Sequence, residues 1–207
     1  MIERLGKYRV TEVLGEGAMG IVYRAFDPDI RRQVAIKTMR ALGDGDGVSG
    51  VSPTDRFRNE ARAAGRLQHP GIVAVYDFGR DAGVDFIAME YVRGHTLSRY
   101  LAQAAAGQLD IDDNDVQSII GQLLDALHHA HEQGVWHRDV KPTNLIITQD
   151  GKVKVSDFGI ARIESAELTM AASAIGTPLY MAPEQFQGRA IDRRVDLYAT
   201  GVVLYHM

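Results

Sequence analysis

The first part of the chain carries short apolar runs with the spacing of β-strands. Residues 8–14 alternate between apolar and polar side chains, residues 21–26 are β-branched and aromatic, and residues 33–39 form an apolar run with one lysine. Residues 71–78 and 84–90 are two further runs, separated by a glycine-containing turn. Short runs of this composition between turn signals are typical of strands, so this region is predicted to form an antiparallel sheet.

Apolar side chains recur at helical spacing in other segments. Residues 53–67 form a predicted helix that begins at a capping signal and places Phe57, Ala61, Ala64 and Leu67 on one face. Beyond Gly94 the pattern becomes helical, with a short helix expected around residues 97–101 and a last one within 192–207. Between them lies a longer predicted helix whose apolar stripe consists of Val116, Ile119, Ile120, Leu123, Leu124 and Leu127.

The change from strands to helices near Gly94 divides the chain into two parts. We expect a small lobe of residues 1–92, a hinge at residues 90–94 and a larger, mainly helical lobe of residues 95–207. The predicted fold class is therefore α+β with two lobes.

Composition excludes several classes of protein. The 207 residues are 45% hydrophobic and 24% charged, which is ordinary for a globular chain. A formal net charge of −4 gives no basic footprint for nucleic acid, and the absence of cysteine excludes disulfides and thiolate metal sites. No signal peptide is evident, and no segment reaches the roughly 18 apolar residues that a membrane span needs. We therefore expect a cytoplasmic protein with no nucleic-acid partner.

Four polar side chains are expected to gather on two loops. Asp139, Lys141 and Asn144 share the first loop, and Asp157 opens the second. Together they supply a carboxylate that can act as a base, a cation and two oxygen ligands for a metal ion. Phosphoryl transfer needs such a set, because catalysis consists of positioning a hydroxyl group and neutralising developing charge with Mg²⁺.

A predicted hairpin connects these two loops. The apolar runs 145–147 and 153–155 flank the turn dipeptide Asp150-Gly151, which is a common hairpin signal. Because the strands of a hairpin lie next to each other, the loops at their open ends should also be neighbours.

A glycine-rich stretch, residues 15–20 with the spacing G-x-G-x-x-G, separates the first two long predicted strands. In a dinucleotide-binding fold the last glycine would open a helix, whereas residues 21–26 favour a strand. A Walker loop is excluded, because Ile21-Val22 stands where a lysine and a hydroxyl residue belong. The remaining interpretations are a hairpin whose backbone N–H groups approach phosphate oxygens and a simple flexible hairpin.

Lys37 lies within a predicted strand, in the sequence Val-Ala-Ile-Lys, and Glu60 lies on the predicted helix. A strand lysine usually faces solvent. Glu60 has a similar alternative, a solvated helix face, because four arginines surround it: Arg56, Arg58, Arg62 and Arg66. The functional interpretation of both residues therefore depends on the neighbouring motifs.

Taken together, these motifs resemble those of the protein kinases, especially the eukaryotic-like Ser/Thr kinases of bacteria. Two motifs occur in the order that the family shows: the catalytic-loop sequence His-Arg-Asp-Val-Lys-Pro-Thr-Asn at residues 137–144 and Asp-Phe-Gly at residues 157–159. The resemblance implies a two-lobed kinase fold and an enzyme that transfers the γ-phosphate of Mg-ATP to Ser or Thr hydroxyls of a protein substrate.

The resemblance also implies a role for each residue. Asp139 would accept the hydroxyl proton, Lys141 would steady the γ-phosphate, and Asn144 and Asp157 would hold Mg²⁺. The implied ATP-binding set comprises Leu14, Gly15, Glu16, Gly17, Ala18, Met19, Gly20, Ile21, Val22, Ala35, Lys37, Glu60, Met89, Glu90, Val92 and Ile146. Within it Glu60 would pair with Lys37, and the Glu90 carbonyl and Val92 N–H would meet the adenine edge.

Residues 160–183 are polar and end in Ala-Pro-Glu, which resembles an activation segment. Thr169 and Ser173 are candidate phosphosites, and Arg138 is the residue that would bind the phosphate. The alternative is that both are ordinary loop residues. Thr177 matches the threonine that approaches Asp139 in Ser/Thr kinases, and is assigned to the catalytic site.

The sequence ends inside a helix that this family buries beneath later helices. Leu197, Val202, Val203, Leu204 and Tyr205 are therefore expected to lack cover, and Glu184 to lack the arginine with which it pairs in the family. We expect a C-terminally truncated large lobe that can self-associate through residues 195–207. The alternative function is a weakly active or inactive nucleotide-binding regulatory fragment.

Overall fold

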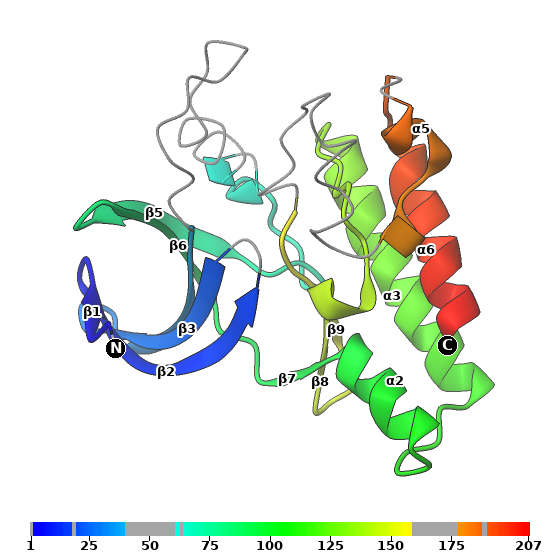
Figure 1. Ribbon diagram of the computed structural model, residues 1–207, viewed down its shortest axis with the longest axis horizontal. Coiled ribbons are helices and arrows are strands. Elements are labelled where there is room, and N and C mark those ends of the chain that lie inside the picture. Colours follow the sequence, from blue (N-terminus) through cyan, green and yellow to red (C-terminus); the bar gives the residue numbers. More distant parts are fainter. Residues whose placement is uncertain (1, 18–19, 40–60, 63, 159–177, 188–189) are drawn as a thin grey trace. The chain divides into compact units, whose positions relative to one another are not determined.

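The computed structural model describes residues 2–17, 20–39, 61–62, 64–158, 178–187 and 190–207 (Figure 1). The chain forms two compact units. The first unit comprises Met1–Arg66 and Ala74–Tyr91, and the second comprises Leu67–Val73 and Val92–Met207.

The first unit is built on an antiparallel sheet of six strands, in the order β1-β2-β3-β4-β6-β5 (Figure 1). The strands are β1 Arg4–Leu5, β2 Tyr8–Gly17, β3 Gly20–Asp27, β4 Arg32–Thr38, β5 Val75–Asp81 and β6 Val84–Glu90. Every predicted strand is present, and the short β1 is an addition that pairs with β2.

The core of this unit lies on one face of the sheet. Tyr23 of β3 lies opposite Ile36 of β4, which in turn lies opposite Ala88 of β6, and all three are buried. Leu5, Tyr8, Ala25, Val34 and Phe86 complete the cluster. Because side chains alternate along a strand, Ala35 and Lys37 on either side of Ile36 point to the opposite face. The core thus dictates where Lys37 points.

The second unit contains a sheet of three strands, β7 Gly94–Thr96, β8 Leu145–Thr148 and β9 Val153–Val155. The hairpin predicted for β8 and β9 is confirmed, with Leu145 opposite Val155. The chain was expected to be helical directly after Gly94, but residues 94–96 pair with β8 first. Gly94 makes this approach possible, because a Cβ atom there would collide with the Ile147 carbonyl.

The helices of the second unit are α2 Leu97–Ala105, α3 Asp113–Glu132, α5 Pro183–Phe186 and α6 Arg194–His206, with 3₁₀ turns η1 Pro142–Asn144 and η2 Pro178–Tyr180. Helix α3 begins at a capping box, in which the Asp112 side chain accepts the Asp115 N–H at 2.8 Å and the Asp115 carboxylate accepts the Asp112 N–H at 3.3 Å. Its stripe is buried at Ile119, Leu123 and Leu127, but Leu124, which was predicted to belong to it, is 40% exposed.

Helix α3 also holds the β8–β9 hairpin in place. The Gln122 side chain accepts the Val153 N–H at 3.0 Å and donates to the Gly151 carbonyl at 3.1 Å. Such paired bonds fix both the position and the rotation of the turn. The loops at the open end of the hairpin are thereby positioned relative to the largest helix of the unit.

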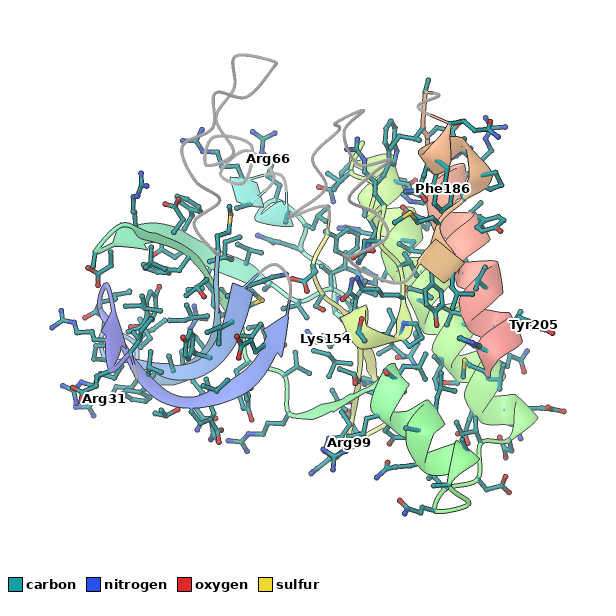
Figure 2. All side chains as sticks on the ribbon, in the orientation of Figure 1. Arg31, Arg66, Arg99, Lys154, Phe186 and Tyr205 are labelled. Carbon is teal, nitrogen blue, oxygen red and sulfur yellow. The ribbon has the colours of Figure 1, made fainter. Side chains whose placement is uncertain are left out.

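Helix α6 packs on α3. Its buried residues include Val195, Ala199 and Val203, which follow one another every four residues and so share one face. The expectation that Val203 lacks cover is therefore wrong. Leu197, Leu204 and Tyr205 lie on other faces of the helix and are exposed, as expected. Figure 2 shows Tyr205 pointing outward from α6. No helix in the described part of the chain is both long and apolar enough to cross a lipid bilayer.

The predicted hairpin of residues 71–78 and 84–90 begins only at Val75. Residues 71–73 instead bond to β9 of the second unit, since the Val73 N–H donates to the Val155 carbonyl at 2.9 Å and the Val155 N–H donates to the Gly71 carbonyl at 2.8 Å. An apolar run does not reveal which strand it will pair with. Residues 67–73 accordingly belong to the second unit, although they precede Ala74–Tyr91 of the first.

The helix predicted for residues 53–67 lies mostly outside the described residues. Residues 61–62 and 64 are helical, and Ala61, Ala64 and Leu67 are buried as the stripe predicted.

Candidate active site

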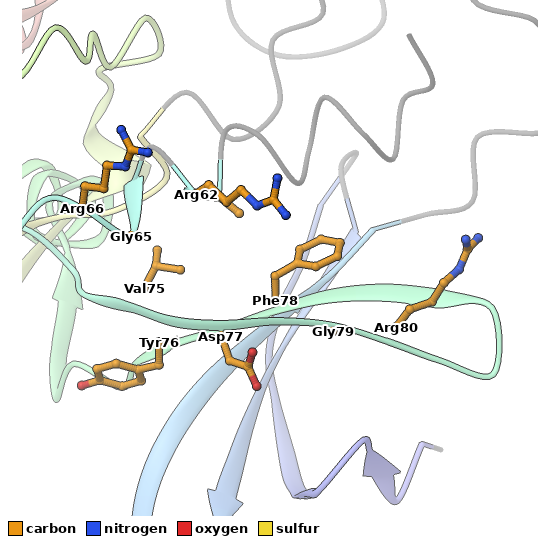
Figure 3. A pocket seen from close by; sticks show the side chains of 10 residues that line it. Arg62, Gly65, Arg66, Val75, Tyr76, Asp77, Phe78, Gly79 and Arg80 are labelled. Atoms are coloured by element: carbon orange, nitrogen blue, oxygen red, sulfur yellow. The ribbon is translucent and has the colours of Figure 1, made fainter.

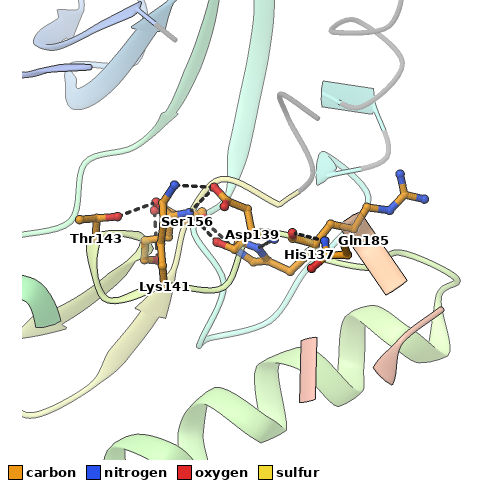
Figure 4. A network of polar contacts seen from close by, with 8 residues as sticks. His137, Asp139, Lys141, Thr143, Ser156 and Gln185 are labelled. Carbon is orange, nitrogen blue, oxygen red and sulfur yellow. Dashed lines mark hydrogen bonds and ion pairs between the residues drawn. The ribbon is translucent and has the colours of Figure 1, made fainter. Parts of the chain in front are cut away.

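The loop before β8 brings three of the predicted catalytic side chains together (Figure 4). The Lys141 ammonium lies 2.7 Å from the Asp139 carboxylate. The Asn144 side-chain nitrogen donates to the Asp139 carbonyl at 2.9 Å and lies 3.3 Å from its carboxylate. Asp139 and Lys141 keep 29% and 25% of their side-chain surface exposed, whereas Asn144 is buried. A carboxylate that solvent can reach is thus held between a cation and an amide.

A buried carboxylate fixes the backbone that precedes this cluster. Asp196 of α6 is fully buried and accepts the His137 N–H at 2.9 Å and the Arg138 N–H at 2.6 Å. His131 lies 2.7 Å from the same carboxylate. Arg138 has a φ of 64°, a left-handed conformation that costs a non-glycine residue about 1–3 kcal/mol and persists only where the surroundings impose it. Asp196 supplies part of that constraint.

His137 joins the two loops of the site. Its Nδ1 accepts the Asp139 N–H at 3.2 Å, and its Nε2 lies 2.8 Å from the Ser156 carbonyl. Because a backbone N–H can only donate, Nδ1 carries no proton and Nε2 is the donor. The buried ring also packs on Phe158, with 4.7 Å between centroids. His137 therefore serves as a structural link, a role that the sequence pattern alone did not reveal.

Asn144 and Asp157 lie at the open end of the hairpin, as predicted. The Ser156 N–H and hydroxyl both donate to the Asn144 carbonyl, at 2.9 Å and 3.2 Å, so Asp157 follows directly from a residue bonded to Asn144. Asp157 has a φ of 64°, which turns the chain sharply as it leaves β9. The structure thus brings the two predicted metal ligands into one corner of the second unit.

The donor set in this corner fits Mg²⁺. Asn144 uses its nitrogen toward Asp139, and its oxygen, the atom that a cation needs, accepts a long hydrogen bond from the Thr143 hydroxyl at 3.5 Å. Among the described residues no group of three or more His, Cys, Asp or Glu side chains is placed to hold a metal ion. Mg²⁺ typically takes only one or two protein oxygens and completes its shell with phosphate oxygens and water. An amide oxygen and a carboxylate therefore suit it.

In the first unit, part of the predicted ATP-binding set lies on one face of the sheet. Val22 of β3 lies opposite Lys37 of β4, and Ala35 of β4 lies opposite Met89 of β6. Directly opposed residues share a face, and so do residues two apart on one strand. The sheet face opposite the core cluster is therefore lined by Val22, Ala35, Lys37 and Met89. Lys37 is only 8% exposed.

The glycine-rich hairpin forms the far end of β2 and β3. Gly15, Glu16 and Gly17 lie opposite Val22, Ile21 and Gly20, and Leu14 sits at a register shift between the paired residues Val13 and Gly15. Glu90 is bonded twice to Ala74, through its backbone N–H at 2.8 Å and its carboxylate at 3.2 Å. Val92 and Ile146 belong to the second unit. Ala18, Met19, Glu60, Thr169, Ser173 and Thr177 lie outside the described residues.

The segment that follows Thr177 contains three contacts that the sequence analysis missed. Gln185 of α5 donates to the Arg138 carbonyl at 3.1 Å, and its oxygen accepts the Ala182 N–H at 2.9 Å. A glutamine three residues into a helix is a known capping signal, which could have indicated the second bond but not the first. The Tyr180 hydroxyl lies 2.6 Å from His206 Nδ1, and burial raises the pKa of this phenol.

The first unit contains a cavity of about 620 Å³ (Figure 3). It is lined by residues 75–80 of β5 and by residues 61, 62, 65 and 66, with Val75 and Phe78 on the side of Arg62 and Arg66. None of the predicted site residues lines it. Cavity size therefore does not locate the active site here.

Comparison with known proteins identifies the family. Residues 8–207 match the family model described as the protein kinase domain. The chain belongs to the protein kinase family. It is 44% identical over 209 residues to a protein of Streptomyces coelicolor that is named a probable serine/threonine-protein kinase, and 39% identical over 203 residues to the serine/threonine-protein kinase PrkC of Bacillus subtilis.

The solved structures support the same fold. The PknI kinase domain of Mycobacterium tuberculosis matches with a TM-score of 0.79 at 31% identity, over 100% of this chain and 77% of that one. The matches to the Streptomyces and Bacillus kinases cover 98% of this chain but 30% of each relative. The chain thus spans less than a third of the length of these two proteins.

Proposed function

We propose that this chain is the catalytic region of a Ser/Thr protein kinase, which transfers the γ-phosphate of ATP to a Ser or Thr hydroxyl of a protein substrate. The observation that supports this most directly is the cluster of Asp139, Lys141 and Asn144 on one rigid loop. Its members have the chemistry that phosphoryl transfer requires, and the family membership makes that reaction the expected one.

Asp139 is the proposed base. Its carboxylate is partly exposed, so an incoming hydroxyl can reach it, and the Lys141 ammonium lies 2.7 Å from it. Lys141 has three donors and can contact a phosphate oxygen while it remains paired with Asp139. Neighbouring base and cation would thus hold the acceptor hydroxyl and the transferred group side by side, with Thr177 as the proposed additional residue of the acceptor site.

Asn144 and Asp157 are the proposed ligands of Mg²⁺. The ion, when bound, would neutralise the charge that develops on the phosphate oxygens during transfer. The chain's own contribution is to present two oxygens from a fixed corner, because the Ser156 bonds to the Asn144 carbonyl hold both loops together.

Nucleotide binding is assigned to the small lobe of residues 1–92 with the hinge at 90–94, and catalysis to residues 95–207. In the first unit Lys37 provides a nearly buried cation on the same face as the apolar Val22, Ala35 and Met89. A cation among apolar neighbours interacts with phosphate more strongly than it would in water. The apolar members of the set would accommodate the base of ATP.

Three finer features belong to the same proposal. Thr169 and Ser173 are proposed as autophosphorylation sites, and Arg138 is proposed to bind the phosphate group. Helix α6, whose Leu197, Leu204 and Tyr205 are exposed, is proposed to mediate self-association. The cytoplasm is the proposed location, because ATP is available there.

The test is phosphate transfer from radiolabelled ATP to a generic Ser/Thr substrate in the presence of Mg²⁺. We expect labelled phosphoserine or phosphothreonine, and loss of most of the label in Asp139→Asn. Substitution of the exposed Asp110 by Asn is a matched control that should leave the label unchanged. Absence of transfer by the unaltered chain, or equal transfer by Asp139→Asn, would contradict the proposal.

A further inference from the structure

Gln185 forms a side-chain contact between α5 and the catalytic loop (Figure 4). Its nitrogen donates to the Arg138 carbonyl at 3.1 Å, and its oxygen accepts the Ala182 N–H at 2.9 Å. The amide nitrogen makes one bond and the amide oxygen makes the other, so both bonds can form at the same time. Gln185 therefore connects the first turn of α5 to the residue before the proposed base.

The Arg138 carbonyl and the Asp139 N–H belong to the same peptide plane. Gln185 holds the carbonyl end of this plane, and His137 Nδ1 accepts from the N–H end at 3.2 Å. A peptide group is planar, so a plane that is bonded at both ends cannot rotate freely about the chain. Rotation of this plane would swing the Cα–Cβ bond of Asp139, and hence its carboxylate.

The plane needs external support because its first residue is strained. Arg138 has a φ of 64°, outside the region that a side chain other than glycine prefers. Its N–H is held by Asp196 of α6 at 2.6 Å, and its carbonyl by Gln185 of α5. Loss of the second bond would remove one constraint on the orientation of this carbonyl, and the strain at Arg138 would favour its rotation.

We infer that Gln185 is a positioning residue, which couples the segment of residues 178–186 to the orientation of the Asp139 carboxylate. This inference rests on the proposed function, because it assigns Gln185 a role in the reaction of that site. A displacement of α5 would therefore move the Arg138–Asp139 peptide through the Gln185 amide, and with it the proposed base, Asp139. Gln185 does not touch the reacting atoms, and it acts only through the Arg138–Asp139 peptide.

Two substitutions separate the two bonds of Gln185. Gln185→Glu keeps an oxygen that can accept the Ala182 N–H but places a second oxygen against the Arg138 carbonyl, so it removes the coupling bond alone. Gln185→Met has a similar length and removes both bonds. The matched control is Gln187→Met, because Gln187 lies two residues further on and is exposed.

Each variant is made in the unaltered chain and in Asp139→Asn. We measure kcat for a Ser/Thr peptide, the Kd of Mg-ATP, the melting temperature, and hydrogen exchange of the amides of residues 137–140. In the unaltered chain, Gln185→Glu and Gln185→Met should lower kcat about tenfold or more, since a small misplacement of a reacting group is costly. The Kd of Mg-ATP should stay within about twofold, and exchange at the Asp139 amide should become faster. Gln187→Met should behave as the unaltered chain.

The Asp139→Asn background distinguishes positioning from general destabilisation. If Gln185 acts through the Asp139 carboxylate, its substitution should lower kcat by less than about twofold in the Asp139→Asn background. An equal loss of kcat in both backgrounds would overturn the inference, as would unchanged kcat and unchanged exchange in Gln185→Glu. If the unaltered chain transfers no phosphate, the proposed function fails, and the exchange comparison still decides whether Gln185 holds the Arg138–Asp139 peptide.

Discussion

The buried carboxylate of Asp196 accepts the backbone N–H of Arg138 at 2.6 Å, and thereby ties α6 to the catalytic loop. The two residues are 58 positions apart in the chain. The same carboxylate accepts the His137 N–H at 2.9 Å. One side chain thus satisfies two buried backbone donors in a segment with a strained conformation.

Asp196→Ala should therefore destabilise the second unit strongly. It leaves two backbone N–H groups without an acceptor, each at a cost of about 1–3 kcal/mol, so the free energy of unfolding should fall by several kcal/mol. Urea unfolding measures this change. Asp110→Ala, which alters an exposed aspartate, should stay within about 0.5 kcal/mol of the unaltered chain. Similar unfolding curves for both variants would show that the Asp196 bonds contribute little.

Lys37→Met should abolish most phosphate transfer without unfolding the first unit. The methionine side chain fits the apolar face of Val22 and Met89, but the cation proposed to contact phosphate is lost. A fall in kcat of about a hundredfold or more is expected, as for other lost electrostatic contacts in transition states. Lys152→Met, at an exposed position in the β8–β9 turn, is the control. Wild-type rates in Lys37→Met would refute the role of Lys37.

Asp139 and Asp157 are predicted to differ in which step they affect. Asp157→Asn should weaken nucleotide binding in the presence of Mg²⁺ and leave binding without Mg²⁺ unchanged, because it removes a ligand of the ion. Asp139→Asn should leave binding intact and reduce kcat by about 10²–10⁴, the contribution of a general base. Calorimetric titration and single-turnover kinetics separate the two. The assignment of roles is wrong if both variants lose only affinity for ATP.

Thr169 or Ser173 should become phosphorylated when the chain is incubated with Mg-ATP. Phosphate adds about −1.5 to −2 charges at neutral pH, and Arg138 offers a cation directly before the proposed base. Mass spectrometry of peptides covering residues 163–176 tests this. The same peptides from Asp139→Asn should be unmodified if the reaction is autophosphorylation. Full activity with unmodified peptides in the unaltered chain would exclude the regulatory role.

Self-association should depend on the exposed face of α6. Leu204 and Tyr205 are 46% and 91% exposed, and such side chains gain free energy when a partner covers them. Sedimentation at increasing protein concentration should show dimers or larger species, which the double substitution Leu204→Lys and Tyr205→Lys should reduce. Leu109→Lys, at another exposed leucine, should have no such effect. A chain that stays monomeric at all concentrations would contradict this proposal.

Local sequence signals determined most of the individual elements. Alternation and β-branched composition predicted β2, β3, β4 and β6, and the Asp150-Gly151 turn predicted the β8–β9 hairpin with its correct partners. The spacing of Asp139, Lys141 and Asn144 on one short loop was enough to predict that they meet, because few residues separate them. Such features depend on neighbours along the chain, and for that reason a single sequence reveals them.

Only the tertiary structure decided which distant groups meet. Residues 71–73 pair with β9 rather than continuing β5, because an apolar run carries no mark of its partner. The contacts of Asp196 and Gln185 with the Arg138 backbone are equally invisible in the sequence, since a backbone acceptor or donor looks the same at every position. Leu124 is exposed for a similar reason: helical spacing predicts a face, but tertiary packing determines which of its members are covered. Val203, which the family resemblance suggested would lack cover, is buried in this structure.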